Sequence, residues 1–493
     1  MSIRYKIKEG DSRDLADVKS FITLLSNLDS HQNDTLRDYF SGSDDIYIAR
    51  APGRLDVMGG IADYSGSLVL EMPIREATLT AVTLTGEPVV EIISLPPSRD
   101  ENVKHFSMPV SDFIQNGEPI SYKKANEYFE SRDAVWAAYI AGAFLVLMRE
   151  KSVKFHSGAK ILIDSDVPEG KGVSSSAALE VSVMTALVAA FDLSIDAAEI
   201  AALCQMVENL IVSAPCGIMD QMTSVFGSES SLMSLLCQPA ELKDPVTIPD
   251  GLAFWGIDSD IRHAVSGADY GTVRTAAFMG YRILAAKHGF EIEDSSGRLE
   301  IRDPIWNGYL ANISPAEYEQ YYRQFLPENM QGKDFLKTYD HITDPVTSVT
   351  QDVEYPVRVA TEHPIYESFR VRLFSQLLQG DLTRERLILL GELMYQSHSS
   401  YSACGLGSEG TDRLVHMVRS FGPENGLYGA KITGGGSGGT VAILGKRDAG
   451  DKIYEIADIY EKETDRTAKV FSGSSMGAKQ FESVTIQRGG SGN

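Results

Sequence analysis

A short run of glycines and serines is the part of this sequence best suited to bind an anion. It reads Gly170-Lys171-Gly172-Val173-Ser174-Ser175-Ser176 and lies between an apolar, β-branched stretch at 159–164 and a small-residue stretch at 177–191. These flanks predict a strand and a buried helix. Unpaired N–H groups and the helix dipole favour an anion at such a helix N-terminus, and glycine permits close approach. We therefore predict a phosphate-binding loop.

The loop is not a Walker A sequence, because no Gly-Lys-Ser/Thr follows the first glycine at the required spacing. A simpler interpretation also fits, in which a serine caps the helix and the glycines only turn the chain. Two more glycine-rich stretches, 51–64 and 429–439, favour the phosphate interpretation.

An arginine and an aspartate follow the β-branched and aromatic stretch at 46–50, which predicts a strand. We expect Pro52 and Gly53 to turn the chain out of that strand, so that Arg54 and Asp63 project from a loop where substrates are usually bound. The alternative is a solvated arginine paired with a neighbouring aspartate.

A lone carboxylate, Asp220, stands among mostly apolar neighbours in the segment 214–221, where Gly217 allows a close approach. A buried acid costs free energy unless it has a partner or a function. From the residues alone, a structural role for Asp220 remains the more frequent outcome.

We expect the elements that position these residues to form two domains, because 493 residues are too many for one ordinary hydrophobic core. We place the boundary after a turn at 249–251, giving domains at 1–250 and 251–493. Helical patterns cover 14–28, 135–148, 365–378 and 382–395, a strand pattern covers 254–259, and 286–350 predicts short helices and loops.

Charge and composition exclude several classes of function. The net charge of -23 and the absence of a basic run argue against nucleic-acid binding. The longest apolar run, 135–148, is shorter than the roughly 20 residues that span a bilayer. Four scattered cysteines without metal-like spacing indicate free thiols, and the N-terminus has no signal pattern, so we expect a cytosolic protein. The oligomeric state is left open.

The stretches 51–64, 167–179 and 429–439, in this order, resemble the motifs of the GHMP kinases. The resemblance implies an α+β fold with an N-terminal phosphate-loop domain, a ferredoxin-like C-terminal domain and an active site between them. It implies ATP and Mg²⁺ as cofactors and a small-molecule acceptor. The nucleotide-binding positions that it implies are Gly170, Lys171, Gly172, Ser174, Ser175, Ser176, Trp136, Gly435 and Gly436.

Several of these positions have plainer alternatives. Lys171 could be solvated, Ser174 could serve mainly as a cap, and Trp136 could be core. The resemblance implies that Ser176 and Glu208 bind the metal, although a helical glutamate is more often exposed.

The segments 51–64 and 214–221 have the galactokinase form. This implies Asp220 as the base facing the anomeric hydroxyl and Arg54 beside the transferred phosphoryl group. It implies Asp63, Gly217 and Tyr270 at the sugar. His263, Arg274 and His398 also lie in galactokinase-like segments, where we expect structural roles.

Galactokinases carry glutamate and histidine where this sequence has Gly60 and Ile61, so the sugar pocket has lost polar partners. The amino-acid sequence of 54–64 resembles that of plant L-arabinokinases most. The interpretation is a kinase acting on the anomeric hydroxyl of a monosaccharide, L-arabinose in the first instance. A galactokinase and a non-catalytic sugar sensor are the alternatives.

Overall fold

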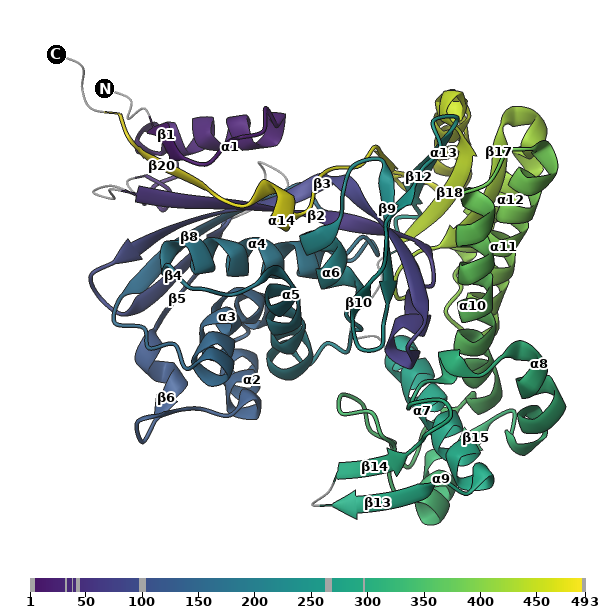
Figure 1. Ribbon diagram of the computed structural model, residues 1–493. Coiled ribbons are helices and arrows are strands. Elements are labelled where there is room, and N and C mark those ends of the chain that lie inside the picture. The colour runs from purple at the N-terminus through teal and green to yellow at the C-terminus, as the bar shows by residue number, and fades with distance from the viewer. Residues whose placement is uncertain are drawn as a thin grey trace.

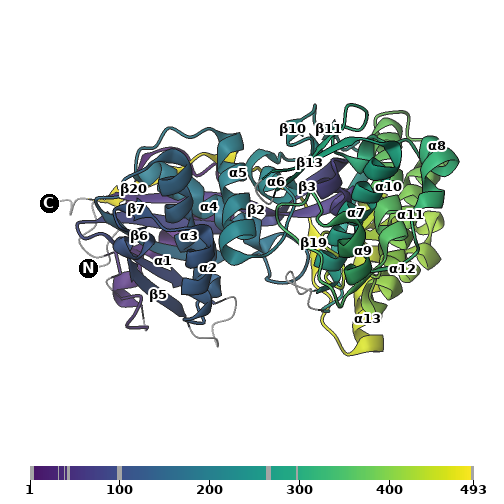
Figure 2. The ribbon, with the colours of Figure 1, turned by 90° about the horizontal axis from the view of Figure 1, so that it is seen from below.

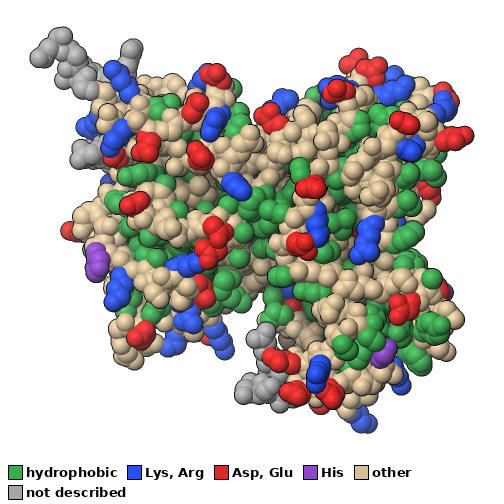
Figure 3. Space-filling model, viewed as in Figure 1, with side chains coloured by type: hydrophobic (Ala, Val, Ile, Leu, Met, Phe, Trp, Pro, Cys, Tyr) green, Lys and Arg blue, Asp and Glu red, His purple; other side chains and the backbone are tan. Residues whose placement is uncertain are grey.

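The computed structural model describes residues 5–31, 33–37, 39–40, 45–96, 103–261, 268–295 and 298–489. These form two lobes: a first lobe built on a large sheet and a second lobe built on a four-stranded sheet (Figures 1 and 2). Notches at the edges of the space-filling view separate them, and charges of both signs are spread over this face (Figure 3).

A long antiparallel hairpin connects the two lobes. Its strands are β2 (Asp45–Met58) and β3 (Leu68–Thr85), paired from Tyr47 opposite Val82 to Met58 opposite Leu70. The hairpin tip, the 3₁₀ helix η2 (Gly60–Ser65), contacts the second-lobe helices α7 (Ala268–His288) and α10 (Val357–Leu378).

The expectation that Pro52 and Gly53 end the strand is wrong. β2 continues past them with only a shift of register between Pro52 and Arg54. Gly53 instead permits a close contact, because a Cβ there would lie 2.6 Å from the Val173 carbonyl and 2.8 Å from Val167 Cγ1. The phosphate loop therefore packs directly on β2.

Helices cover both faces of the first sheet, whose main path runs β1-β20-β2-β3-β8-β4-β5. Along β8 (Gly158–Ser165), Ile161 and Ile163 face a core with α3–α6, whereas Leu162 faces α1, as the period of a strand requires. The other elements are β1 (Tyr5–Glu9), β4 (Val89–Ser94), β5 (Lys104–Pro109), β9 (Ser231–Leu236), α1 (Ala16–Ser26), α2 (Tyr122–Glu130), α3 (Val135–Lys151), α4 (Ser175–Ala190), α5 (Ala197–Met206) and α6 (Met219–Phe226).

The second lobe has the strand order β17-β18-β12-β19. Its elements include β12 (Leu252–Asp258), β17 (Leu427–Ile432), β18 (Thr440–Lys446), β19 (Val470–Ser472), α9 (Gly332–Tyr339), α11 (Arg384–Ala403), α12 (Glu409–Phe421) and α13 (Gly450–Thr464). The segment 286–350 also contains a hairpin, β13 (Glu291–Ser295) with β14 (Arg298–Arg302), that the sequence pattern did not predict.

The chain returns to the first lobe at its end. Strand β20 (Val484–Arg488) lies between β1 and β2 in the large sheet. The domain boundary at residue 250 stays a prediction. β20 lies in the predicted second domain by its position in the sequence, but it belongs to the sheet of the first lobe.

One apolar core joins the lobes. It combines Leu55 and Met72 of the hairpin, Val173 of the phosphate loop, Phe374 of α10 and Leu390 of α11. In the described part of the chain, no helix is both long enough and apolar enough to cross a bilayer.

Candidate active site

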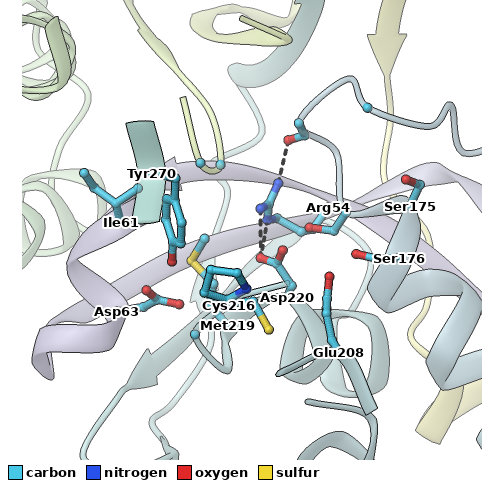
Figure 4. Close-up of a pocket in the computed structure, with 17 residues that line it drawn as sticks. Arg54, Ile61, Asp63, Ser175, Ser176, Glu208, Cys216, Met219, Asp220 and Tyr270 are labelled. Atoms are coloured by element: carbon cyan, nitrogen blue, oxygen red, sulfur yellow. Dashed lines mark hydrogen bonds and ion pairs between the residues drawn. The ribbon is translucent and has the colours of Figure 1, made fainter. Parts of the chain in front are cut away.

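A pocket between the lobes brings together the sequence motifs that we singled out. Its lining comes from the hairpin, the phosphate loop with the start of α4, the turn at 207–212, the segment before α6 with the start of α6, α7 and the third glycine-rich loop (Figure 4). The lining residues are Arg54, Ile61, Asp63, Gly170, Gly172, Ser174, Ser175, Ser176, Glu208, Pro215, Cys216, Gly217, Met219, Asp220, Tyr270, Gly434 and Gly435.

Arg54 and Asp220 form an ion pair at the centre of this pocket. Arg54 Nη2 lies 2.8 Å from Asp220 Oδ1, and its Nε lies 2.9 Å from the same oxygen. Arg54 Nη1 also donates to the Gly172 carbonyl at 2.7 Å. The side chain of Arg54 is 3% exposed and that of Asp220 is 19% exposed, so Asp220 is the member of the pair that a substrate can reach.

A second carboxyl group lies behind the arginine. Glu71 Oε2 of β3 is 3.4 Å from Arg54 Nε, and neither Glu71 oxygen has a hydrogen bond within the described residues. Burial raises the pKa of Glu71 well above its usual value, and the nearby Asp56 adds to this. Burial would lower the pKa of Arg54, but the carboxyl groups of Asp220, Glu71 and Asp56 together raise it. Arg54 therefore stays a cation.

The residues that we expect to bind the sugar lie together, on the side of Asp220 away from Ser175 and Ser176 (Figure 4). Asp63, on η2, accepts the Tyr64 N–H at 2.6 Å. A Cβ at position 217 would lie 1.6 Å from Asp63 Oδ2, so glycine is required there by the carboxyl group itself. Burial, with a contribution from Asp220, raises the pKa of Asp63 to about 7. The Tyr270 hydroxyl points toward the same region (Figure 4).

Three residues of the predicted phosphate loop have a left-handed backbone conformation. Gly170, Gly172 and Ser174 all have positive φ values, near 71°, 72° and 57°. The expected capping role of Ser174 is not observed, because its side chain accepts no cap hydrogen bond and its Oγ is buried without a partner in the described residues. Ser175 and Ser176 begin α4 and line the pocket.

The third glycine-rich loop lies against the phosphate loop. Thr440 Oγ1 donates to the Lys171 carbonyl at 2.8 Å. Gly435 lines the pocket, whereas Gly436 packs on Leu406 away from it. Lys171 is not solvated, since its Nζ lies 2.9 Å from Asp258 of β12 and pairs also with Asp260.

Glu208 is buried, so the exposed alternative is wrong. It lies on a π-helical turn, η4 (Val207–Val212), and accepts the Gln221 side-chain N–H at 2.7 Å. Burial raises its pKa to about 7, although the Ser176 hydroxyl opposes the shift. Ser176 and Glu208 point toward one another (Figure 4). The described residues contain no group of three or more His, Cys, Asp or Glu side chains that could hold a metal alone.

Trp136 lines a neighbouring cavity, not the main pocket. That cavity shares Gly170, Ser175 and Ser176 with the pocket, and it is also lined by Tyr139. Trp136 is half-buried and packs edge-on against Phe106.

The remaining galactokinase-like positions divide as follows. Arg274 holds Asp344 through two hydrogen bonds of 2.8 Å and donates to the Cys216 carbonyl at 3.0 Å. Its role is structural, but it ties two non-helical segments to α7 and does not join two helices. His398 lies 3.0 Å from Asp412 and accepts the Ile432 N–H, which is also structural. His263 lies outside the described residues.

Sequence reasoning missed several residues near the site. Glu71 and Glu180 are buried acids on an apolar strand and an apolar helix, and a charge within such a run was the available signal. Tyr401 gave no signal, because nothing in its local sequence predicts contact with residues 340 positions earlier.

Comparison with known proteins agrees with this geometry. The sequence matches the family models described as GHMP kinases N terminal domain at residues 138–228, GHMP kinases C terminal at 378–461, and galactokinase galactose-binding signature at 35–84. This chain belongs to the GHMP kinase family.

Two curated relatives illustrate its place among GHMP kinases. An L-arabinokinase of Arabidopsis thaliana is 45% identical across 98% of this chain and 52% of the relative, so the chain spans about half of that protein's length. A galactokinase of Actinobacillus pleuropneumoniae serotype 3 (strain JL03) is 26% identical across 84% of this chain and 89% of the relative.

Two solved structures share the fold. Lactococcus lactis galactokinase complexed with galactose has a TM-score of 0.69 at 19% identity, covering 93% of this chain and 99% of that one. Methanococcus jannaschii mevalonate kinase has a TM-score of 0.53 at 16% identity, covering 88% and 99%. Both are members of the GHMP kinase fold.

Proposed function

We propose that this chain transfers the γ-phosphoryl group of ATP to the anomeric hydroxyl of L-arabinose, giving L-arabinose 1-phosphate and ADP. The observation that carries the proposal is the Arg54–Asp220 ion pair, which lies between the sugar-side residues and the phosphate loop. The identity to an L-arabinokinase supports the choice of sugar.

In this proposal, Asp220 accepts the proton of the anomeric hydroxyl as that oxygen attacks phosphorus. Arg54 offsets the charge that develops on the phosphoryl group, and it needs little reorganisation because Gly172 and Asp220 already hold it. Asp63 and Tyr270 hold the ring hydroxyls and orient the acceptor.

The nucleotide would lie along the phosphate loop. Its phosphates would accept hydrogen bonds from the N–H groups at the start of α4. The Ser174 hydroxyl, which has no partner among the described residues, is also available to them. The neighbouring cavity at Trp136 would hold the adenine. Lys171 is already paired with Asp258, so we assign it to holding the second lobe against the phosphate loop instead of to phosphate binding.

The residues present fit Mg²⁺. The ion prefers oxygen ligands and usually combines one or two carboxylates with substrate phosphates. Ser176 and Glu208 supply one hydroxyl and one carboxyl oxygen, and Gln221 fixes Glu208 in place. When bound, the ion would neutralise charge on the β- and γ-phosphates.

A panel of sugars with ATP and Mg²⁺ tests the proposal. We expect ADP release to depend on L-arabinose and the product to carry phosphate on its anomeric carbon by ³¹P and ¹³C NMR. A higher kcat/KM for D-galactose would reassign the sugar and keep the reaction. Sugar binding without ATP turnover would indicate the sensor alternative.

A further inference from the structure

Tyr401 lies behind the sugar side of the pocket and links the two lobes through its hydroxyl. It belongs to α11 and is 0% exposed. Its Oη accepts the Ile61 N–H at 2.9 Å and donates to the Gly434 carbonyl at 3.0 Å. Ile61 and Gly434 both line the pocket. One phenol therefore fixes a wall residue of the first lobe against a loop of the second.

The same hydroxyl occupies the space next to Gly60. A Cβ at position 60 would lie 1.6 Å from Tyr401 Oη and 2.6 Å from Asp56 Oδ2, and the φ of Gly60 is +43°. Gly60 itself does not line the pocket. The space of the missing side chain at position 60 is thus filled by a tyrosine from the other lobe, which is buried and does not line the pocket.

The surroundings of Tyr401 hold the hairpin tip in one position. Asp56 accepts the Gly60 N–H at 3.1 Å and the Gly434 N–H at 3.3 Å. Lys431 Nζ lies 2.6 Å from Asp56, and both side chains are fully buried. Because these groups are hydrogen-bonded and buried, shifting the tip to admit a longer side chain would break several bonds at once.

We infer that Tyr401 is a positioning residue that sets sugar specificity: it excludes a polar side chain from position 60 and holds Ile61 as an apolar wall of the sugar site. This inference rests on the proposed function. It also implies that restoring the galactokinase residues at positions 60 and 61 fails while Tyr401 is present.

An apolar wall distinguishes two sugars that share their ring hydroxyls. L-Arabinopyranose matches D-galactopyranose at the ring but lacks the sixth carbon and its hydroxyl. In this site, that extra hydroxyl would be buried without a partner, a disadvantage of roughly 5- to 150-fold in kcat/KM.

Tyr401→Phe tests the inference, because it keeps the ring and removes only the hydroxyl. Ile61 then loses the hydrogen bond that holds it as an apolar wall, so the wall can yield to the sixth carbon of galactose. We expect the ratio of kcat/KM for L-arabinose over D-galactose to fall at least fivefold, mainly through KM. The control is Tyr395→Phe on the same helix, whose hydroxyl makes no hydrogen bond with the described residues; it should leave the ratio unchanged.

Gly60→Ala provides a second test, of the contact between position 60 and the Tyr401 hydroxyl. In the wild-type background, the added methyl meets Tyr401 Oη, so kcat/KM should fall sharply. In the Tyr401→Phe background, the same substitution should cost less, and the two changes should be non-additive. If Tyr401→Phe does not fold, Ile61→Val is the alternative variant. It keeps every hydrogen bond, and its smaller side chain should lower the ratio of kcat/KM for L-arabinose over D-galactose.

The outcomes separate the inference from the function on which it rests. A wild-type protein that phosphorylates neither sugar would overturn the proposed function. A wild-type preference for L-arabinose that Tyr401→Phe leaves unchanged, with additive effects of Gly60→Ala, would overturn the inference alone.

Discussion

Asp220 and Arg54 are the residues to which the proposed reaction assigns the chemistry. The arginine is held by two carboxyl groups and a carbonyl. Among the described residues, the aspartate side chain pairs only with the arginine, and its other side is open toward the pocket. This asymmetry supports the proposal that the aspartate accepts the proton and the arginine stabilises charge.

Asp220→Asn should keep ATP and sugar binding but lower kcat by roughly 10²- to 10⁴-fold, because the amide cannot accept the proton. Calorimetric binding and steady-state rates measure the two effects. Unchanged kcat would exclude Asp220 as the base, and loss of the folded state would indicate a structural role.

If Glu208 binds Mg²⁺ as proposed, activity should depend on both pH and Mg²⁺. Its pKa is raised to about 7 by burial, and a carboxyl group must lose its proton to bind the metal. At limiting Mg²⁺, we expect kcat/KM to fall as pH drops below about 7. A higher Mg²⁺ concentration should move this acidic fall of kcat/KM to lower pH. A fall that stays at the same pH would contradict Glu208 as a metal ligand.

The same shift has a consequence for stability, with a definite sign. A carboxyl group whose pKa is raised on folding contributes stability below its unfolded pKa, near 4.5, and loses it as pH rises through about 7. Glu208→Gln should therefore lose less stability than wild type between pH 5 and pH 8, as measured by urea unfolding.

At the scale of elements, the contact between β2 and the phosphate loop positions the site. Gly53 lets Val173 approach the strand, and the Arg54 N–H donates to the Val173 carbonyl at 3.0 Å. The arginine side chain thereby reaches the Gly172 carbonyl. Strand and loop act as one unit, although 118 residues separate Arg54 from Gly172.

Gly53→Ala should disturb this unit, because the new methyl group would overlap the Val173 carbonyl and Val167. Overpacking of this kind costs about 1–3 kcal/mol. We expect a lower free energy of unfolding and a higher KM for ATP. Gly86→Ala, whose methyl group would meet nothing within 4 Å, is the control and should change neither quantity.

At the scale of the whole molecule, the end of the chain completes the first sheet. Ile486 of β20 is fully buried, and the strand pairs on both sides, with β1 and with β2. The second lobe is therefore connected to the first at both of its ends, through the segment before β12 and through β20.

Ile486→Ala should lower the free energy of unfolding by about 2–5 kcal/mol, as large-to-small substitutions in cores do. The kcat of the folded protein should stay unchanged, because the pocket contains no residue of β20. Urea unfolding measures the loss, and the exposed Gln487→Ala on the same strand is the control. A stability loss equal to that of the control would contradict the core role of β20.

The sequence by itself determined the local chemistry of this protein. The strand at 159–164, the glycine-serine loop and the helix after it follow from residue type and period, because those preferences act between neighbours. Resemblance then gave the family and most of the pocket residues, since a motif keeps its spacing wherever it lies in the chain.

Only the tertiary structure decided the contacts between distant segments. It placed Arg54 on a strand, because the clash that defines Gly53 comes from Val173. It paired Lys171 with Asp258, buried Glu71 behind the arginine and brought Tyr401 against Gly60. Each depends on two segments packed across the interface between lobes or along the hairpin, and no local pattern records which distant side chain fills a given space.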